Sequence, residues 1–260
     1  MYKKLNDILH KNYLLDVINI EKNSESTVGN VYIVYTTNNR YVLKIYDDIV
    51  HTESMVFLHQ DLSNKFNIPE IILTRDSRGY IEIDNKYIVL YSFLEGIQIG
   101  KLDKITEDII KQIAMELRKL HDSTLNTNKY KLKEIPFYNK YDLDRKSLLH
   151  FDLTKGNIFY KKNKIGFIDF DDAKYGYSIF DVSILIALFF FSKRRGVDKS
   201  NLNIFLDSYY ENDLELKLKE VKYIKEIALN WIDNVLSTND FHSSLKESFE
   251  VKKKLIEENL

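Results

Sequence analysis

Cysteine is absent from this 260-residue chain, which excludes both a disulfide framework and a cysteine-based zinc site. Long apolar runs are absent as well. The longest, residues 184–191, is far shorter than the roughly 20 residues that a membrane-spanning helix needs. The first residues lack the apolar core of a signal peptide. We therefore expect a cytoplasmic protein without membrane association, and its 44% of hydrophobic residues can form a sizeable core.

An excess of basic charge is also missing. The chain has 38 Lys and Arg against 39 Asp and Glu, a formal net charge of −1. Proteins that bind nucleic acids in general carry a basic surface, so we expect no nucleic-acid partner. A glycine-rich phosphate loop is missing too, because residues 23–30 contain a single glycine and no G-x-G-x-x-G pattern.

Polar residues gather around one expected β-hairpin. Residues 157–160 and 164–170 are β-prone runs, separated by a polar turn at 161–163. In an antiparallel hairpin the start of the first strand lies beside the end of the second, so Asn157 and Asp169 should meet at the open end. An amide oxygen and a carboxylate suit Mg²⁺. The loop before the hairpin places Asp152 near this metal site, where it can act as a general base.

These residues form a pattern that resembles the catalytic and metal-binding segments of kinase-fold enzymes. The pattern is H-x-D-x-x-x-x-N over residues 150–157, followed by I-D-F at 168–170. The amino-acid sequences of these two segments, together with the later Asp181, are most similar to those of the aminoglycoside phosphotransferase and choline kinase family. That resemblance implies a phosphotransferase that uses Mg²⁺ and takes ATP or GTP as its phosphate donor.

The departures from the protein-kinase pattern favour a small-molecule kinase. Phe151 stands where protein kinases have Arg, and Asp171 stands where they have Gly. The chain also has no Ala-Pro-Glu segment. The expected substrate is therefore a small hydroxylated molecule.

The expected fold is α+β, a two-lobed protein-kinase-like structure. Short β-prone runs dominate residues 15–91, and one helix is expected at about 52–66 with Thr52 as its N-cap. This segment reads as an antiparallel β N-lobe with one helix. We place the nucleotide-binding N-lobe at residues 1–95.

Helical periodicity takes over after residue 96. Helices are expected over residues 104–121 and 178–192, and two or three more within 201–260. The C-lobe, residues 96–260, would carry the catalytic loop, the metal site and the helices that bind the acceptor.

The resemblance assigns further roles in the N-lobe. Lys44 would contact the ATP α- and β-phosphates, and Glu53 would hold Lys44 in place. Ser26, in the loop at residues 23–30, offers a hydroxyl and a backbone N–H to the phosphates. The adenine would meet the backbone of three consecutive hinge residues, Ser92, Phe93 and Leu94.

Other polar residues of the C-lobe have supporting roles. We expect His150 to orient the loop rather than act as the base, and Asp181 to brace the catalytic loop. His121, at the end of a helix, reads as structural. Asp171 could contact either a second metal or the substrate, and the sequence does not decide between these two roles.

The first functional expectation is an ATP- or GTP-dependent O-phosphotransferase acting on an aminoglycoside or related antibiotic, a resistance kinase. Acidic residues within 196–260 would suit a cationic acceptor, although exposed helix faces explain them equally well. Two alternatives stay open: a metabolic kinase of the homoserine or choline type, and an inactive kinase-fold binding or structural protein. The intact set Lys44, Asp152, Asn157 and Asp169 favours an active enzyme. The sequence does not determine the oligomeric state.

Overall fold

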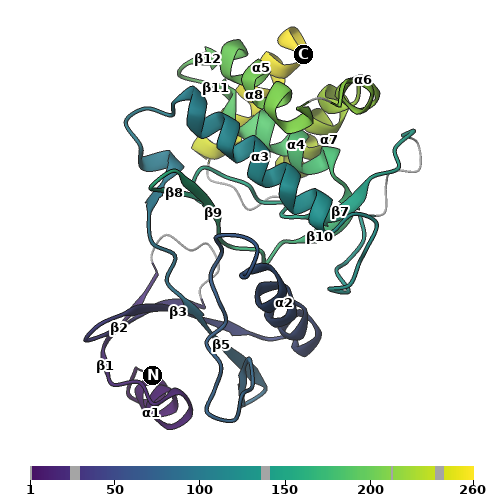
Figure 1. Cartoon of the computed structure of the whole chain (residues 1–260). Coiled ribbons are helices and arrows are strands. Elements are labelled where there is room, and N and C mark those ends of the chain that lie inside the picture. Colours follow the sequence, from purple (N-terminus) through teal and green to yellow (C-terminus); the bar gives the residue numbers. More distant parts are fainter. Residues whose placement is uncertain (1, 24–29, 136–140, 212, 238–242) are drawn as a thin grey trace. The chain divides into compact units, whose positions relative to one another are not determined.

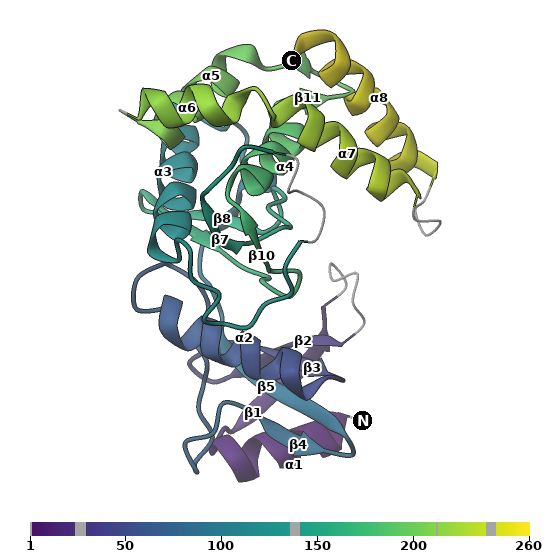
Figure 2. The same cartoon turned by 90° about the vertical axis from the view of Figure 1, so that its right-hand side faces the viewer.

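A computed structural model describes residues 2–23, 30–135, 141–211, 213–237 and 243–260 of the chain. The chain divides into two units, shown in Figures 1 and 2. The first comprises Met1–Glu95 with Gly166–Ile168, and the second comprises Gly96–Ile165 with Asp169–Leu260. Each unit buries apolar side chains of its own.

The first unit is built on an antiparallel sheet with the strand order β1-β2-β3-β5-β4. Asp84 and Asn85 both have positive φ, 53° and 58°, and form the two-residue turn between the last two strands. Asp and Asn tolerate positive φ better than most residues, so the sequence predicts a turn here. The strands are β1 (Val17–Lys22), β2 (Val31–Thr36), β3 (Arg40–Tyr46), β4 (Ile81–Ile83) and β5 (Lys86–Ser92).

Helices α1 (Tyr2–Tyr13) and α2 (Ile49–Leu62) cover opposite faces of this sheet (Figure 2). Successive residues of a strand point to opposite faces. On β5, Leu90 therefore packs in one cluster with Leu9 of α1, and Val89 packs in another with Val56 of α2. The sequence expectation had one helix here and missed α1.

The expected N-cap of α2 is wrong. The helix begins one turn earlier, and Asp48 caps it by accepting a hydrogen bond from the His51 N–H at 3.0 Å. Thr52 lies inside the helix, buried, and its hydroxyl donates to the Asp48 carbonyl at 2.6 Å. Both residues are favourable caps, and Asp48 is the one whose side chain accepts a backbone N–H in the first turn.

A short segment from late in the sequence completes the first unit. Gly166 forms a parallel bridge with Asn67, and the Phe167 N–H donates to the Asn67 carbonyl at 3.1 Å. A Cβ at Gly166 would lie 2.6 Å from that carbonyl oxygen and 2.9 Å from Leu94. The close approach of the two backbones therefore requires glycine at this position.

The second unit is mainly helical. Helix α3 packs along α5, and α4 packs along α7. Almost every residue of α4 is buried, so this helix is apolar on all sides. No helix among the described residues is both long and apolar enough to cross a bilayer. The helices are α3 (Glu107–Ser123), α4 (Ile179–Phe189), α5 (Lys199–Tyr210), α6 (Leu214–Val221), α7 (Ile224–Ser237) and α8 (Ser243–Asn259), with a short 3₁₀ helix at Ile99–Lys101.

Short strands carry the loops of this unit. Strands β8 (Ile158–Lys161) and β9 (Lys164–Phe167) form the expected hairpin, with β6 (Ile97–Gln98) beside β8. Its turn is tighter than expected: Lys162 and Asn163 both have positive φ, as a two-residue hairpin turn requires. Two further pairs are β7 (Lys146–Leu149) with β10 (Lys174–Tyr177), and β11 (Phe191–Ser192) with β12 (Gly196–Val197).

A buried acid lies among the C-terminal helices. Glu220 of α6 is 2% exposed, and its carboxylate accepts a hydrogen bond from the Tyr210 hydroxyl at 2.9 Å. Burial raises the pKa of Glu220 to about 7, although the Tyr210 hydrogen bond and the charges of Arg145 and Arg118 oppose the rise.

This shift predicts a pH dependence of stability. The folded protein binds more protons than the unfolded chain between the ordinary pKa of 4.5 and the raised value of about 7. The free energy of unfolding should therefore fall as the pH rises through this window. In Glu220→Gln that fall should shrink by about 1–3 kcal/mol, measured by urea denaturation at pH 4.5 and 8. Glu215→Gln, at an exposed position of the same helix, should show the same fall in the free energy of unfolding as the wild-type protein. An unchanged slope in Glu220→Gln would contradict the assignment.

Candidate active site

The loop that leads into the β8–β9 hairpin, residues 150–157, is called the catalytic loop below. Within it Asp152 and Asn157 are in direct contact. The Asn157 side-chain N–H₂ group donates to the Asp152 carbonyl at 2.8 Å and to its Oδ2 at 2.7 Å. Since the amide nitrogen is used, Asn157 keeps Oδ1 as an acceptor atom, and no hydrogen bond to it occurs within the described chain.

Carboxylates crowd around Asp152. Burial raises the pKa of Asp152 to about 6, and the negative charges of Asp169 and Asp172 add to the rise. The hydrogen bond from Asn157 opposes it. A cation near these acids would relieve their mutual repulsion, so the electrostatics favour a cation site.

The chemistry of the ligands fits Mg²⁺. Asn157 precedes β8 and Asp169 follows β9, so the hairpin ends in one amide oxygen and one carboxylate. Across the described ranges no three His, Cys, Asp or Glu side chains are grouped as ligands for a metal. Mg²⁺ is commonly held by one or two protein ligands and completes its shell with phosphate and water, whereas structural zinc needs a full protein set. The residues present therefore fit Mg²⁺ rather than a structural zinc ion.

Asp181, in the first turn of α4, holds the backbone of the catalytic loop. Its Oδ2 accepts the His150 N–H at 2.7 Å and its Oδ1 accepts the Phe151 N–H at 2.8 Å. Phe151 has a φ of 68°, in the left-handed region that non-glycine residues avoid. The buried carboxylate, 1% exposed, thus stabilises a strained turn directly before Asp152.

Two histidines support this arrangement. The His150 ring is fully buried, packs on Phe170 at 4.4 Å between ring centres, and its Nδ1 lies 3.4 Å from the Asp152 N–H. His121 Nε2 lies 3.2 Å from Asp181 Oδ2. No local sequence pattern connects His121 to the loop. The available signal was its position four residues after Leu117, on the buried stripe of α3.

The far end of the loop is fixed separately. The Gln98 side chain donates to the Gly156 carbonyl at 3.0 Å, and the Gly100 N–H donates to the Lys155 carbonyl at 3.0 Å. The Lys155 ammonium donates to the carbonyl of Phe189, at the end of α4, at 3.3 Å. None of these contacts was foreseen, because each depends on tertiary placement.

In the first unit, Lys44 lies on β3 between β2 and β5. Strand alternation puts it on the face of Val42 and Tyr46, which is the face that α2 covers. Its Nζ lies 5.9 Å from the centre of the Tyr91 ring. A cation over an aromatic ring is favourable in itself.

The structure does not bring Glu53 to Lys44. Glu53 is exposed on α2, and its carboxylate accepts a hydrogen bond from the Tyr80 hydroxyl at 3.3 Å. No ion pair joins Glu53 to Lys44 in the part of the chain that the structure describes. The reason is visible in the sequence, where Glu53 falls off the apolar stripe of the helix.

The hinge residues differ in whether their backbone hydrogen-bonding groups are already used within the protein. The Ser92 N–H donates to the Glu70 carbonyl at 2.8 Å, and its hydroxyl accepts the Glu70 N–H at 2.8 Å. Ser92 is therefore already engaged. The backbones of Phe93 and Leu94 make no hydrogen bond within the described ranges, which leaves these groups to a ligand. Ser26, the predicted phosphate contact, lies outside the described residues.

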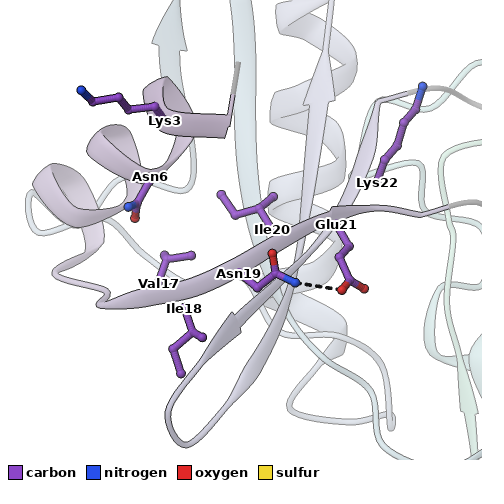
Figure 3. Close-up of a pocket in the computed structure, with 8 residues that line it drawn as sticks. All are labelled: Lys3, Asn6, Val17, Ile18, Asn19, Ile20, Glu21 and Lys22. Atoms are coloured by element: carbon purple, nitrogen blue, oxygen red, sulfur yellow. Dashed lines mark hydrogen bonds between the residues drawn. The ribbon is translucent and has the colours of Figure 1, made fainter.

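A hollow of about 740 Å³ lies between α1 and β1, lined by Lys3, Asn6 and the strand Val17–Lys22 (Figure 3). Asn19 and Glu21 are hydrogen-bonded to each other within it at 2.8 Å. None of the predicted site residues lines it, so this hollow is not part of the candidate active site.

Comparison with known proteins gives consistent matches. The model of the Phosphotransferase enzyme family matches residues 132–213, which include the catalytic loop, Asp169 and Asp181. Protein LicA homolog from Mycoplasma capricolum subsp. capricolum is 23% identical over 236 residues, 79% of this chain and 87% of the relative.

Solved structures resemble the chain over nearly its whole length. AMP-bound spectinomycin phosphotransferase APH(9)-Ia has a TM-score of 0.70 at 17% identity, with 98% of this chain and 96% of that one covered. Choline kinase LicA from Streptococcus pneumoniae has a TM-score of 0.65 at 14% identity, with 99% of each chain covered.

Together these matches confirm the α+β, protein-kinase-like fold. They also confirm the resemblance to the aminoglycoside phosphotransferase and choline kinase family, which the Phosphotransferase enzyme family model carries over residues 132–213.

The left-handed backbone at Phe151 predicts an unusual order of stability. Phe151→Gly should be more stable than Phe151→Ala by about 1 kcal/mol, because only the alanine Cβ is strained in the left-handed region. At Thr154 of the same loop, where φ is not positive, alanine should be the more stable of the two. Urea denaturation of the four variants measures both orders. Equal stability at position 151 would contradict the strained turn.

Proposed function

We propose that this protein transfers the γ-phosphate of ATP or GTP to the hydroxyl group of a small cationic alcohol of the choline type. The observation that carries the reaction class is the contact between Asp152 and Asn157, with Asp169 beside it and Asp181 behind it. A base, an amide and a second carboxylate in this order suit phosphoryl transfer, in which positioning and charge neutralisation supply most of the catalysis.

The two carboxylate oxygens of Asp152 have different roles, one in fixing the side chain and one in accepting a proton. Asn157 holds Oδ2 at 2.7 Å, which fixes the side chain. Oδ1 has no hydrogen-bond partner within the described ranges, so it is the atom that would accept the proton of the acceptor hydroxyl.

Asn157 Oδ1 and the Asp169 carboxylate would hold Mg²⁺, which when bound neutralises charge on the phosphates. Lys44 would contact the α- and β-phosphates. The base of the nucleotide would meet the backbone of Phe93 and Leu94. Glu53 stays a predicted support for Lys44, with the Tyr80 contact as its present partner.

The relatives favour the choline-type acceptor over the antibiotic. The LicA homologue matches by sequence over 79% of the chain, and the S. pneumoniae LicA is a choline kinase of similar fold. This reverses the order expected from sequence alone. An aminoglycoside or related antibiotic is the second candidate, supported by the TM-score of 0.70 with spectinomycin phosphotransferase.

Release of nucleoside diphosphate tests the proposal. ATP and GTP are each offered, with and without Mg²⁺, against choline, spectinomycin, kanamycin, homoserine and simple sugars. We expect Mg²⁺-dependent turnover with the highest kcat/KM for choline. A higher value for an antibiotic would favour the second candidate. Nucleotide binding without transfer to any acceptor would favour a kinase-fold binding protein.

Removal of the base separates chemistry from binding. Asp152→Ala should lower kcat by about 10²–10⁴-fold, the usual size of a general-base contribution, because the acceptor proton loses its destination. The dissociation constant for ATP, measured by calorimetry, should change little. Asp144→Ala, at an exposed acid paired with Lys219, should keep both values. Near-normal turnover in Asp152→Ala would contradict the assignment.

A further inference from the structure

Behind the catalytic loop, three buried side chains connect α4 to α5 through α3. Asp181 of α4 is 1% exposed, His121 of α3 is fully buried, and Tyr209 of α5 is 1% exposed. His121 Nε2 lies 3.2 Å from Asp181 Oδ2, and His121 Nδ1 lies 2.6 Å from the Tyr209 hydroxyl. Helices α3 and α5 pack against each other, and the contact between Tyr209 and His121 joins them.

The positions of the protons follow from the partners. The Asp181 carboxylate already accepts the N–H groups of His150 and Phe151, so it needs a donor from His121, and Nε2 must carry a proton. In the neutral ring Nδ1 is then an acceptor, and the Tyr209 hydroxyl must donate to it. The hydroxyl proton has no other acceptor within the described chain, so this assignment satisfies every group.

We propose that Tyr209 is a positioning residue for phosphoryl transfer: its hydroxyl fixes the Nε2–H tautomer of His121, and through Asp181 it sets the backbone that carries Asp152. The inference rests on the proposed role of Asp152 and adds a remote residue to it. With the other tautomer, a lone pair on Nε2 would face the Asp181 carboxylate. The resulting repulsion would loosen the two hydrogen bonds that hold Phe151 at a φ of 68°.

Tyr209 suits this role in two ways. Burial raises the pKa of its hydroxyl well above the ordinary value, so the group remains a donor across the pH range of activity. Its position is also fixed from outside the network, because Arg118 lies 5.7 Å from the ring centre and donates to the Tyr209 carbonyl at 3.5 Å. Helix α5 is thereby coupled to a loop that it does not contribute to.

Tyr209→Phe tests the role in turnover, since it removes the hydroxyl and keeps the ring. We expect kcat to fall about tenfold, the effect of one unsatisfied buried hydrogen bond, with KM for nucleotide within about twofold. Tyr210→Phe is the matched control: it is the next residue, is 2% exposed, and also loses one buried hydrogen bond, to Glu220. It should lower the free energy of unfolding and leave kcat unchanged. Equal kcat effects in both variants would overturn the proposal.

A double-mutant cycle and a spectroscopic measurement complete the test. In a His121→Gln background Tyr209→Phe should have no further effect on kcat; additive losses would overturn the relay. Nitrogen-15 NMR of the wild-type protein should show His121 protonated at Nε2 and unprotonated at Nδ1, with His121→Gln identifying the signal. Protonation at Nδ1 would overturn the proposal even if no variant folds. Because this readout needs no turnover, it is independent of whether Asp152 proves to be the base.

Discussion

The second unit depends on one buried carboxylate. Asp181 accepts two consecutive backbone N–H groups and stands beside a histidine, so three donors converge on one charge that water does not reach. A buried anion is costly unless its acceptor sites are filled. Here filling them also determines the path of the catalytic loop, because Phe151 takes a backbone conformation that its side chain disfavours. The free energy that keeps the anion in the core therefore also fixes the geometry of the site.

The catalytic loop is held at both ends by different means. At its start the partner is the first turn of α4, through Asp181, and at its end the last turn of the same helix receives the Lys155 ammonium. A cation is favourable at a helix C-terminus. One apolar, fully packed helix thus provides both supports. Asp152 and Asn157 lie between them and hold each other, which leaves one oxygen on each side chain available for chemistry.

Much of this was readable from the sequence, and the limits have physical causes. The hairpin and its polar residues follow local rules, since strand propensity and a polar turn decide them. The partner of Asp181 on α3 and the donor on α5 lie 60 and 88 residues from their respective contacts, and no local pattern identifies them. The role that the resemblance gives Glu53 beside Lys44 stays a prediction. The partner of Glu53 in the structure is Tyr80, a contact that the sequence pattern does not indicate. The acidic composition of residues 196–260 suits any cationic acceptor, and it cannot separate a pocket from an exposed helix face.

The segment Gly166–Ile168 has a consequence for the order of folding. It belongs to the first unit, although the residues on either side of it belong to the second. During synthesis the first 95 residues are made before this segment exists. The backbone of Asn67 can form its contacts with Gly166 and Phe167 only after those residues have been added. The N-terminal unit therefore cannot reach its final contacts as an early, independent domain. A cut between residues 95 and 96 would likewise leave the units joined, because the chain passes from one to the other three times.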